Sequence, residues 1–222
     1  MEEIAGRVGA SVQTAAPLFT REGLKHAAGN FALAISFLVA MIPPARNVSW
    51  SIAGAANVIW LSGAAIMAAM SFVRTPPRRA MVDVYSLSAT GGMLLLPCLM
   101  RPLNPSTGAF ALAGVTLELL GILLTQLARV YMGRSFGILP ANRGIVSRGP
   151  FSAVRHPIYI GWLILSIGYA MSYPSARNVL LILSTLPFMA WRIEQEETLL
   201  RDDPEYVSYS GLVRFRLWPG IV

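Results

Sequence analysis

Six apolar runs of about twenty residues each constrain the fold of this chain more than any other feature of its sequence. A helix needs about 20 mostly apolar residues to cross the hydrocarbon core of a bilayer. Only 13% of the 222 residues are charged, against about a quarter in an ordinary soluble domain, and 55% are hydrophobic. These features predict an all-α fold, a polytopic membrane helix bundle of about six transmembrane helices. The runs cover approximately residues 24–42, 48–73, 81–100, 110–130, 157–173 and 176–192.

The basic residues alternate between the connections, and this pattern predicts the orientation of the helices. Of the 18 Lys and Arg residues, fifteen lie in the two tails and in the second and fourth connections. Only Arg46, Arg101 and Arg177 lie in the other three connections. Basic loops stay on the cytoplasmic side of a membrane. We therefore expect an integral, multi-pass membrane protein with both termini cytoplasmic, and the compact outer loops favour a bacterial inner membrane.

The composition also limits the partners that the chain can bind. The net charge is +7, but the basic side chains are scattered between apolar runs and are not interleaved with aromatic residues. Nucleic-acid binding is therefore not expected. One cysteine and two histidines are too few for a cysteine-rich or histidine-rich metal site, so no metal is expected either. Membrane lipids are the partners that the composition favours, and the oligomeric state is left open.

A polar segment directly before the fifth run has residues suited to binding an anion. Arg155 and His156 precede Pro157, which favours the first turn of a helix because it has no N–H to leave unpaired. The free backbone N–H groups of such a turn, together with an arginine, form an anion-binding arrangement. The alternative is a juxtamembrane Arg-His pair that anchors the helix among lipid headgroups.

Charged residues at the end of the sixth run, and aromatic residues in the tail, form two more polar segments. Arg192 and Glu196 are four residues apart and share one helix face, with Glu197 about 100° away. The helix dipole disfavours carboxylates at a C-terminus, so their presence indicates a cationic partner, although a solvated helix end is the simpler alternative. The tail carries Tyr206, Tyr209 and an Arg-aromatic alternation that is also typical of an interfacial segment.

These three segments, in this order, resemble the isoprenylcysteine carboxyl methyltransferase family and its phospholipid-methylating relatives. The resemblance covers about residues 133–219 and departs from the family between Glu197 and Tyr206, where the stretch containing Asp202-Asp203-Pro204 is shorter than usual. The residues that carry it are Arg155, His156, Pro157, Tyr159, Gly161, Arg192, Glu196, Glu197, Tyr206, Tyr209, Val213, Arg214 and Pro219.

The resemblance implies a methyltransferase that uses S-adenosyl-L-methionine (SAM) and releases S-adenosyl-L-homocysteine (SAH). It implies a cytoplasmic pocket for the cofactor, formed by the last two transmembrane helices, the preceding loop and the C-terminal tail. Arg192 and Glu196 take the catalytic roles beside the reacting groups. The residues implied for cofactor binding are Arg155, His156, Pro157, Tyr159, Gly161, Glu197, Tyr206 and Tyr209.

Three regions of the chain follow from these assignments. Residues 1–23 are expected to form a cytoplasmic tail, and residues 24–130 a four-helix transmembrane region on the acceptor and lipid side. Residues 131–222 are expected to be the SAM-binding catalytic region, which includes the last two transmembrane helices.

The acceptor is expected to be a lipophilic small molecule or a lipidated one, which can enter sideways between membrane helices. A carboxylate like that of an isoprenylcysteine is the first candidate, since it is already ionised and Arg192 can orient it. An amine or a thiol must first lose a proton, and His156 or Glu196 can then act as the base. Two other classes stay open: an NADPH-dependent membrane sterol or steroid reductase, and a non-enzymatic small membrane protein.

Glu118 is an acidic residue in the middle of the fourth run. Gly114, Gly121 and Thr125 lie on the same helical face, a stripe of small residues that favours close packing against another helix. An acid at this depth is either a functional group or a protonated carboxyl that hydrogen-bonds to a neighbouring helix. The sequence does not choose between the two.

Overall fold

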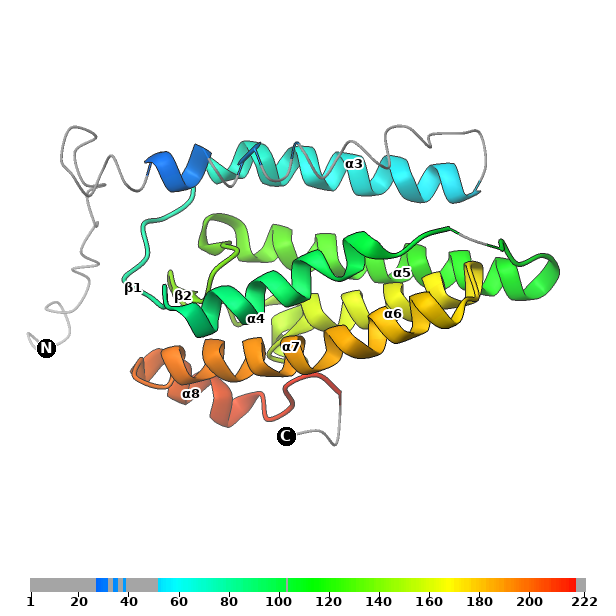
Figure 1. Ribbon diagram of the computed structural model, residues 1–222. Coiled ribbons are helices and arrows are strands. Elements are labelled where there is room, and N and C mark those ends of the chain that lie inside the picture. The colour runs from blue at the N-terminus through cyan, green and yellow to red at the C-terminus, as the bar shows by residue number, and fades with distance from the viewer. Residues whose placement is uncertain (1–26, 32–33, 36–37, 39–51, 103, 219–222) are drawn as a thin grey trace, which may run out of the picture.

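The computed structural model describes residues 27–31, 34–35, 38, 52–102 and 104–218. The expected tail over 1–23 lies outside these ranges, as does most of the first apolar run. The described residues are mostly helical, which agrees with the predicted fold class (Figure 1). The longer helices are α3 (Ile52–Ser71), α4 (Val84–Leu95), α5 (Gly108–Met132), α6 (Pro157–Ser172), α7 (Ala176–Leu200) and α8 (Pro204–Leu212). The short elements are β1 (Arg79–Ala80), η1 (Pro97–Leu99), η2 (Gly133–Ser135), β2 (Ala141–Asn142) and η3 (Gly149–Ser152).

Local sequence signals set the ends of several helices. The side chains of Asp83 and Ser175 accept hydrogen bonds from backbone N–H groups in the first turns of α4 and α7, and so cap them. Pro157 occupies the first turn of α6, as its position predicts. α7 continues past Arg192, where the sixth apolar run ends, for about two further turns to Leu200. Its last part is therefore a helix that carries the charged residues.

α5 is the element that most directly supports a membrane protein. Gly108–Ser135 is the one helical stretch of the described residues that is long and apolar enough to cross a bilayer. The 25 residues of α5 extend about 37 Å, which exceeds the thickness of the hydrocarbon core, about 30 Å. The 12 residues of α4 and the 16 of α6 extend only about 18 and 24 Å. Six spans with both termini cytoplasmic therefore stay a prediction.

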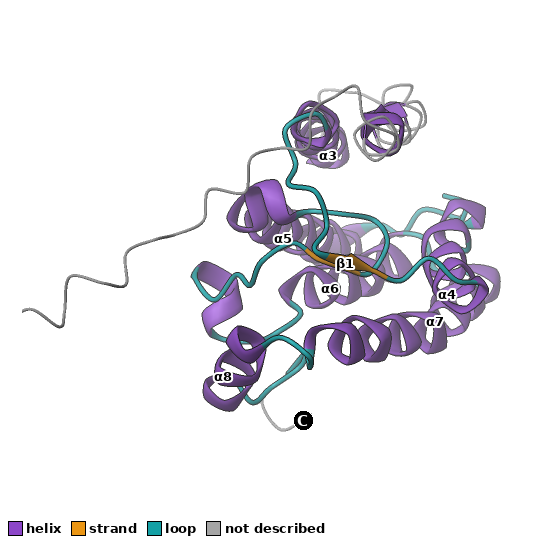
Figure 2. Cartoon of the chain, turned by 90° about the vertical axis from the view of Figure 1, so that its left-hand side faces the viewer, coloured by secondary structure: helices purple, strands orange, loops and turns teal. Residues whose placement is uncertain are grey.

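α5 and α6 lie side by side and approach each other through glycines (Figure 2). A Cβ at Gly121 would lie 2.4 Å from the backbone nitrogen of Leu165, and a Cβ at Gly161 would lie 2.3 Å from the Thr125 hydroxyl oxygen. Side chains larger than hydrogen do not fit at these distances. The small-residue face of the fourth run is thus a helix contact, as expected, and Gly161 is part of it.

Glu118 belongs to the same contact. Its carboxyl accepts a hydrogen bond from the hydroxyl of Ser172, the last residue of α6. A Cβ at Gly168 would lie 2.6 Å from the backbone nitrogen of Glu118, so the two helices meet closely at this level as well. This geometry favours the structural alternative, in which the carboxyl bonds a neighbouring helix.

The connections between the helices gather at two opposite ends of the bundle (Figure 1). At one end β1 pairs antiparallel with β2, with Arg79 opposite Asn142, and α8 lies at the same end. At the other end, the backbone N–H of Arg101 donates to the side-chain oxygen of Asn178 in the first turn of α7, at 3.1 Å. The described connections that are expected to be cytoplasmic therefore share one end of the molecule.

Candidate active site

Arg192 is buried on α7 and is held by partners from four parts of the chain. Its Nε donates to the hydroxyl of Tyr159 on α6 at 2.7 Å. Its Nη2 lies 3.0 Å from Oε1 of Glu196, one turn further along α7, and donates to the carbonyl of Ile138 in the connection before α6. Its Nη1 donates to the hydroxyl of Thr90 on α4. These bonds fix the plane of the guanidinium group.

Tyr159 links this arginine to the carboxylate of Glu196. The Tyr159 hydroxyl accepts from Arg192 and donates to Oε1 of Glu196 at 2.7 Å. On the other side of the carboxylate, Nδ1 of His156 lies 3.7 Å from Oε2. The side chain of Glu196 is 22% exposed, so a ligand can reach it from outside.

Glu197, by contrast, is 2% exposed and enclosed by the side chains of Arg155, His156 and Arg216. Its Oε1 lies 3.1 Å from Nε of Arg155 and 3.2 Å from Nε2 of His156, and its Oε2 lies 2.9 Å from Nη2 of Arg216. Burial acts to raise the pKa of the Glu197 carboxyl, but the hydrogen bond from His156 and the charges of Arg155 and Arg216 lower that pKa below its ordinary value. Glu197 is therefore an ionised, fully paired carboxylate.

The C-terminal tail is bonded to the segment before α6. The backbone N–H groups of Arg155 and His156 donate to the carbonyls of Phe215 and Arg216, both at 2.9 Å. The Arg216 side chain also pairs with Oε2 of Glu194 at 3.1 Å. The tail thus closes one side of the charged cluster.

Tyr206 and Tyr209 on α8 are buried together in an apolar cluster with Ala128, Phe151 and Val213. The hydroxyl of Tyr209 donates to the carbonyl of Phe151 at 2.7 Å. Burial raises the pKa of Tyr209 to about 12 and raises that of Tyr206 further. Both hydroxyls are therefore protonated at neutral pH, and the rings attach α8 to the end of α5.

The structure brings together most of the residues that the sequence predicts for the site. Pro157 starts α6 beside the cluster, whereas Gly161 faces α5 and Tyr206 and Tyr209 pack in the adjoining apolar cluster. The residues that converge in one network of hydrogen bonds and ion pairs are Arg155, His156, Tyr159, Arg192, Glu196 and Glu197.

Sequence reasoning missed three members of this network. The backbone carbonyl of Ile138 could not be predicted from the sequence, because every residue has a backbone carbonyl. Thr90 lies in a helix for which no motif is recognised, so nothing marks it. Arg216 belongs to the Arg-aromatic alternation of the tail. That alternation is the one sequence feature that points to Arg216, and it does not indicate which carboxylates the arginine pairs with.

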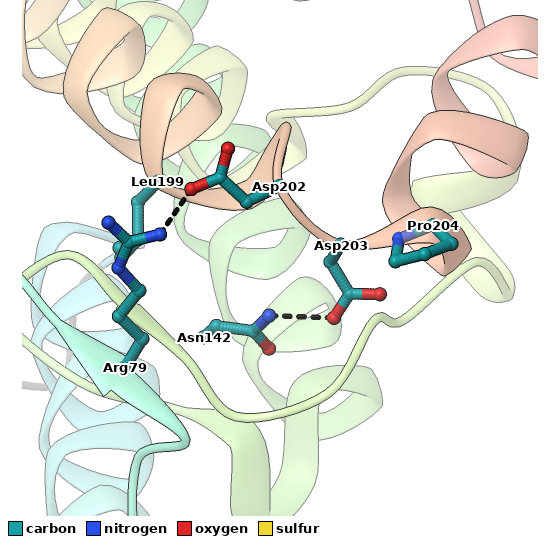
Figure 3. A pocket seen from close by; sticks show the side chains of 6 residues that line it. All are labelled: Arg79, Asn142, Leu199, Asp202, Asp203 and Pro204. Carbon is teal, nitrogen blue, oxygen red and sulfur yellow. Dashed lines mark hydrogen bonds and ion pairs between the residues drawn. The ribbon is translucent and has the colours of Figure 1, made fainter.

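A pocket of about 330 Å³ opens near the cluster and is lined by none of the predicted site residues (Figure 3). Asn142 donates to the carboxylate of Asp203 at 2.7 Å, and this bond lowers the pKa of Asp203. Arg79 pairs with Asp202 across the pocket. Parts of α7, the connection before α6 and the tail contribute to it, but the expected cofactor pocket at the predicted residues stays a prediction.

Comparison with known proteins gives two matches in the same part of the chain. Residues 107–203 match the family profile described as phospholipid methyltransferase. Over 108 residues the chain is 32% identical to protein-S-isoprenylcysteine O-methyltransferase B of Arabidopsis thaliana, an alignment that covers 45% of this chain and 55% of that relative. The chain therefore spans about half the length of the curated relative that it matches. No solved structure matches it.

The fold and the charged cluster are those of a mostly helical, membrane-type protein with a charged site at one end of its helix bundle. Through residues 107–203 the chain is similar to the phospholipid methyltransferase family and to an isoprenylcysteine O-methyltransferase, in agreement with the resemblance. The matched region contains α5, α6 and nearly all of the charged cluster, and it ends at Asp203, before Tyr206, Tyr209 and Arg216.

Proposed function

We propose that this chain is an integral membrane methyltransferase that transfers a methyl group from SAM to a lipophilic acceptor. The observation that carries the proposal is the Arg192–Tyr159–Glu196 network, which lies inside the family match and at the end of the bundle where the basic connections gather. A buried arginine that is fixed on several sides and stands beside an accessible carboxylate is a group suited to positioning a reactant.

Two observations support the fit of SAM to these residues. SAM carries an ammonium, a carboxylate and a sulfonium, and Glu196 is the accessible carboxylate of the cluster, whereas Glu197 is enclosed. Nε of Arg216 is buried and makes no hydrogen bond to a described residue, so it is a donor left for an anionic group. When bound, the cofactor supplies an electrophilic methyl group. Glu197 serves the site by holding Arg155 and His156 in place.

We favour a carboxylate acceptor of the isoprenylcysteine type. Arg192 can bind an ionised carboxylate and orient it without any proton transfer. The phospholipid methyltransferase profile favours a second candidate, the amine of a phospholipid. His156, which lies between Glu196 and Glu197, would then take up the proton that the amine loses.

Ligand binding and methyl transfer by the full chain in detergent test this function. SAH at about 100 times its Kd should stabilise the protein by about 2.7 kcal/mol, whereas NADPH should have no effect. Tritiated methyl should pass from SAM to N-acetyl-S-farnesylcysteine or to phosphatidylethanolamine, and Glu196→Gln should abolish the transfer while the protein stays folded. Stabilisation by NADPH alone would support the reductase alternative. A protein that responds to neither ligand would support the non-enzymatic one.

A further inference from the structure

Thr90 is a buried residue of α4 whose hydroxyl accepts a hydrogen bond from Nη1 of Arg192. The two residues are 102 positions apart in the sequence. α4 belongs to the region expected to face the acceptor, and it lies outside the family match. Thr90 therefore connects the first half of the chain directly to the proposed catalytic arginine.

Most of the N–H donors of Arg192 have an acceptor in the structure. A guanidinium group has five N–H bonds. Nε uses its bond for Tyr159, and Nη2 faces the Ile138 carbonyl and Glu196. Nη1 has two N–H bonds and uses one for Thr90. Within the part of the chain that the structure describes, the other N–H of Nη1 has no acceptor, so the open donor lies on the same nitrogen that Thr90 holds.

The packing of α4 against α7 fixes the position of Thr90. A Cβ at Gly92 would lie 2.4 Å from the ring of Phe188, so the glycine lets the two helices meet closely. Met93 packs with Tyr159 and Met189 next to the arginine. The β-branched side chain of threonine is restricted to two χ1 rotamers in a helix, which limits the directions of its hydroxyl.

The buried face of α4 carries a second polar residue between Thr90 and the start of the helix. Ser86 lies one helical turn before Thr90 on the same face, and both are buried. The hydroxyl oxygen of Ser86 has no hydrogen-bond partner among the described residues. Buried polar atoms are nearly always paired in native proteins, so the unpaired hydroxyl is a group that a polar ligand atom or a water molecule can satisfy.

We infer that Thr90 is a positioning residue for methyl transfer and presents the open N–H of Arg192 Nη1 to an oxygen of the acceptor. The inference rests on the proposed function and deepens it. The acceptor approaches from the α4 side of Arg192. Its carboxylate accepts a hydrogen bond from the open N–H of Nη1, and the bond from the other N–H to Thr90 keeps this nitrogen in position. Thr90 itself acts through the arginine.

Steady-state kinetics of Thr90 variants test this role in the full-length protein in detergent. Wild type, Thr90→Val and Thr90→Ser are compared for kcat and KM with N-acetyl-S-farnesylcysteine, and for the Kd of SAH. Because a hydrogen bond to a charged group is worth about a ten- to hundredfold change in rate, Thr90→Val should lower kcat by about that factor. The Kd of SAH should change less than about twofold, and Thr90→Ser, which keeps the hydroxyl, should restore kcat.

Thr185→Val is the matched control. Thr185 is a fully buried threonine of α7 whose hydroxyl donates to the carbonyl of Leu181 in its own helix, at 2.8 Å. Loss of the Thr185 hydroxyl should leave kcat unchanged. A Thr90→Val protein with wild-type kcat would overturn the inference. So would parallel losses of kcat, SAH affinity and Tm that Thr90→Ser does not restore. A wild-type protein without SAH binding would instead overturn the proposed function, and this inference with it.

Discussion

At the scale of single residues, Glu197 shows how the site tolerates a buried charge. Burying a carboxylate costs several kcal/mol unless other charges compensate. Arg155, His156 and Arg216 supply that compensation at 3.1, 3.2 and 2.9 Å. The three partners come from the segment directly before α6 and from the tail, so one carboxylate joins both segments to α7. Removing it would leave several cationic groups unpaired.

We expect the contribution of Glu197 to stability to depend on pH. Its pKa in the folded protein lies below the ordinary value of 4.5, so the ionised carboxylate stabilises the fold. That stabilisation should be complete above about pH 4.5 and should disappear as the pH falls through the lower, folded pKa. Thermal unfolding of wild type and Glu197→Gln in detergent, compared between pH 3 and pH 8, measures this difference.

Glu194→Gln is the control for this comparison. Glu194 lies on the same helix and also pairs with Arg216, but its side chain is 48% exposed. Exposed ion pairs contribute only about 0–1 kcal/mol. A difference between wild type and Glu197→Gln that is the same at all pH values, or no larger than that of Glu194→Gln, would contradict the structural role of Glu197.

At the scale of elements, the contact between α5 and α6 sets where the start of α6 lies relative to the site. We expect Gly121→Ala to destabilise the protein by about 1–3 kcal/mol, because the new Cβ would meet backbone atoms of Leu165 and Gly161, which cannot move without shifting a helix. Gly91→Ala on α4 is the matched control, since no atom lies within 4 Å of its Cβ position. It should be neutral or stabilising by about 0.5–1 kcal/mol. Equal Tm values for both variants would refute the close helix contact.

The length of α7 shows what hydropathy does and does not indicate. The sixth apolar run ends near Arg192, but the helix continues to Leu200 because charged residues are compatible with a helix, and Arg192 and Glu196 pair along it. Hydropathy indicates where a chain leaves the apolar part of a membrane, and a helix can continue beyond that point. Glu196 and Glu197 are therefore internal residues of α7, held against α6, and do not form a frayed end.

At the scale of the whole molecule, the two ends of the bundle are expected to lie on opposite sides of a membrane. Cys98 is the single cysteine of the chain and is exposed. Its neighbour Leu99 accepts a hydrogen bond from Arg177 at the start of α7, so Cys98 lies at the end opposite to Glu197. The topology predicted from the basic residues places this end outside the cytoplasm.

A membrane-impermeant maleimide applied to intact cells that express the chain tests this orientation. Cys98 should react without permeabilisation. In a Cys98→Ser background, a cysteine introduced by Ser208→Cys, on the exposed face of α8, should react only after permeabilisation. The reverse pattern would overturn the prediction that both termini are cytoplasmic.

The sequence alone determined the properties that depend on local composition and order. Runs of apolar residues predict helices, and the order of the Arg-His-Pro, Arg-Glu-Glu and Tyr segments carries the resemblance to the methyltransferase family. Tertiary structure decided which side chains meet: Glu197 faces His156 across 41 positions, Thr90 reaches Arg192 across 102, and Gly161 turns toward α5. The physical reason is that the direction of a side chain depends on how each helix is rotated against its neighbours, and that rotation follows from close packing between distant parts of the chain.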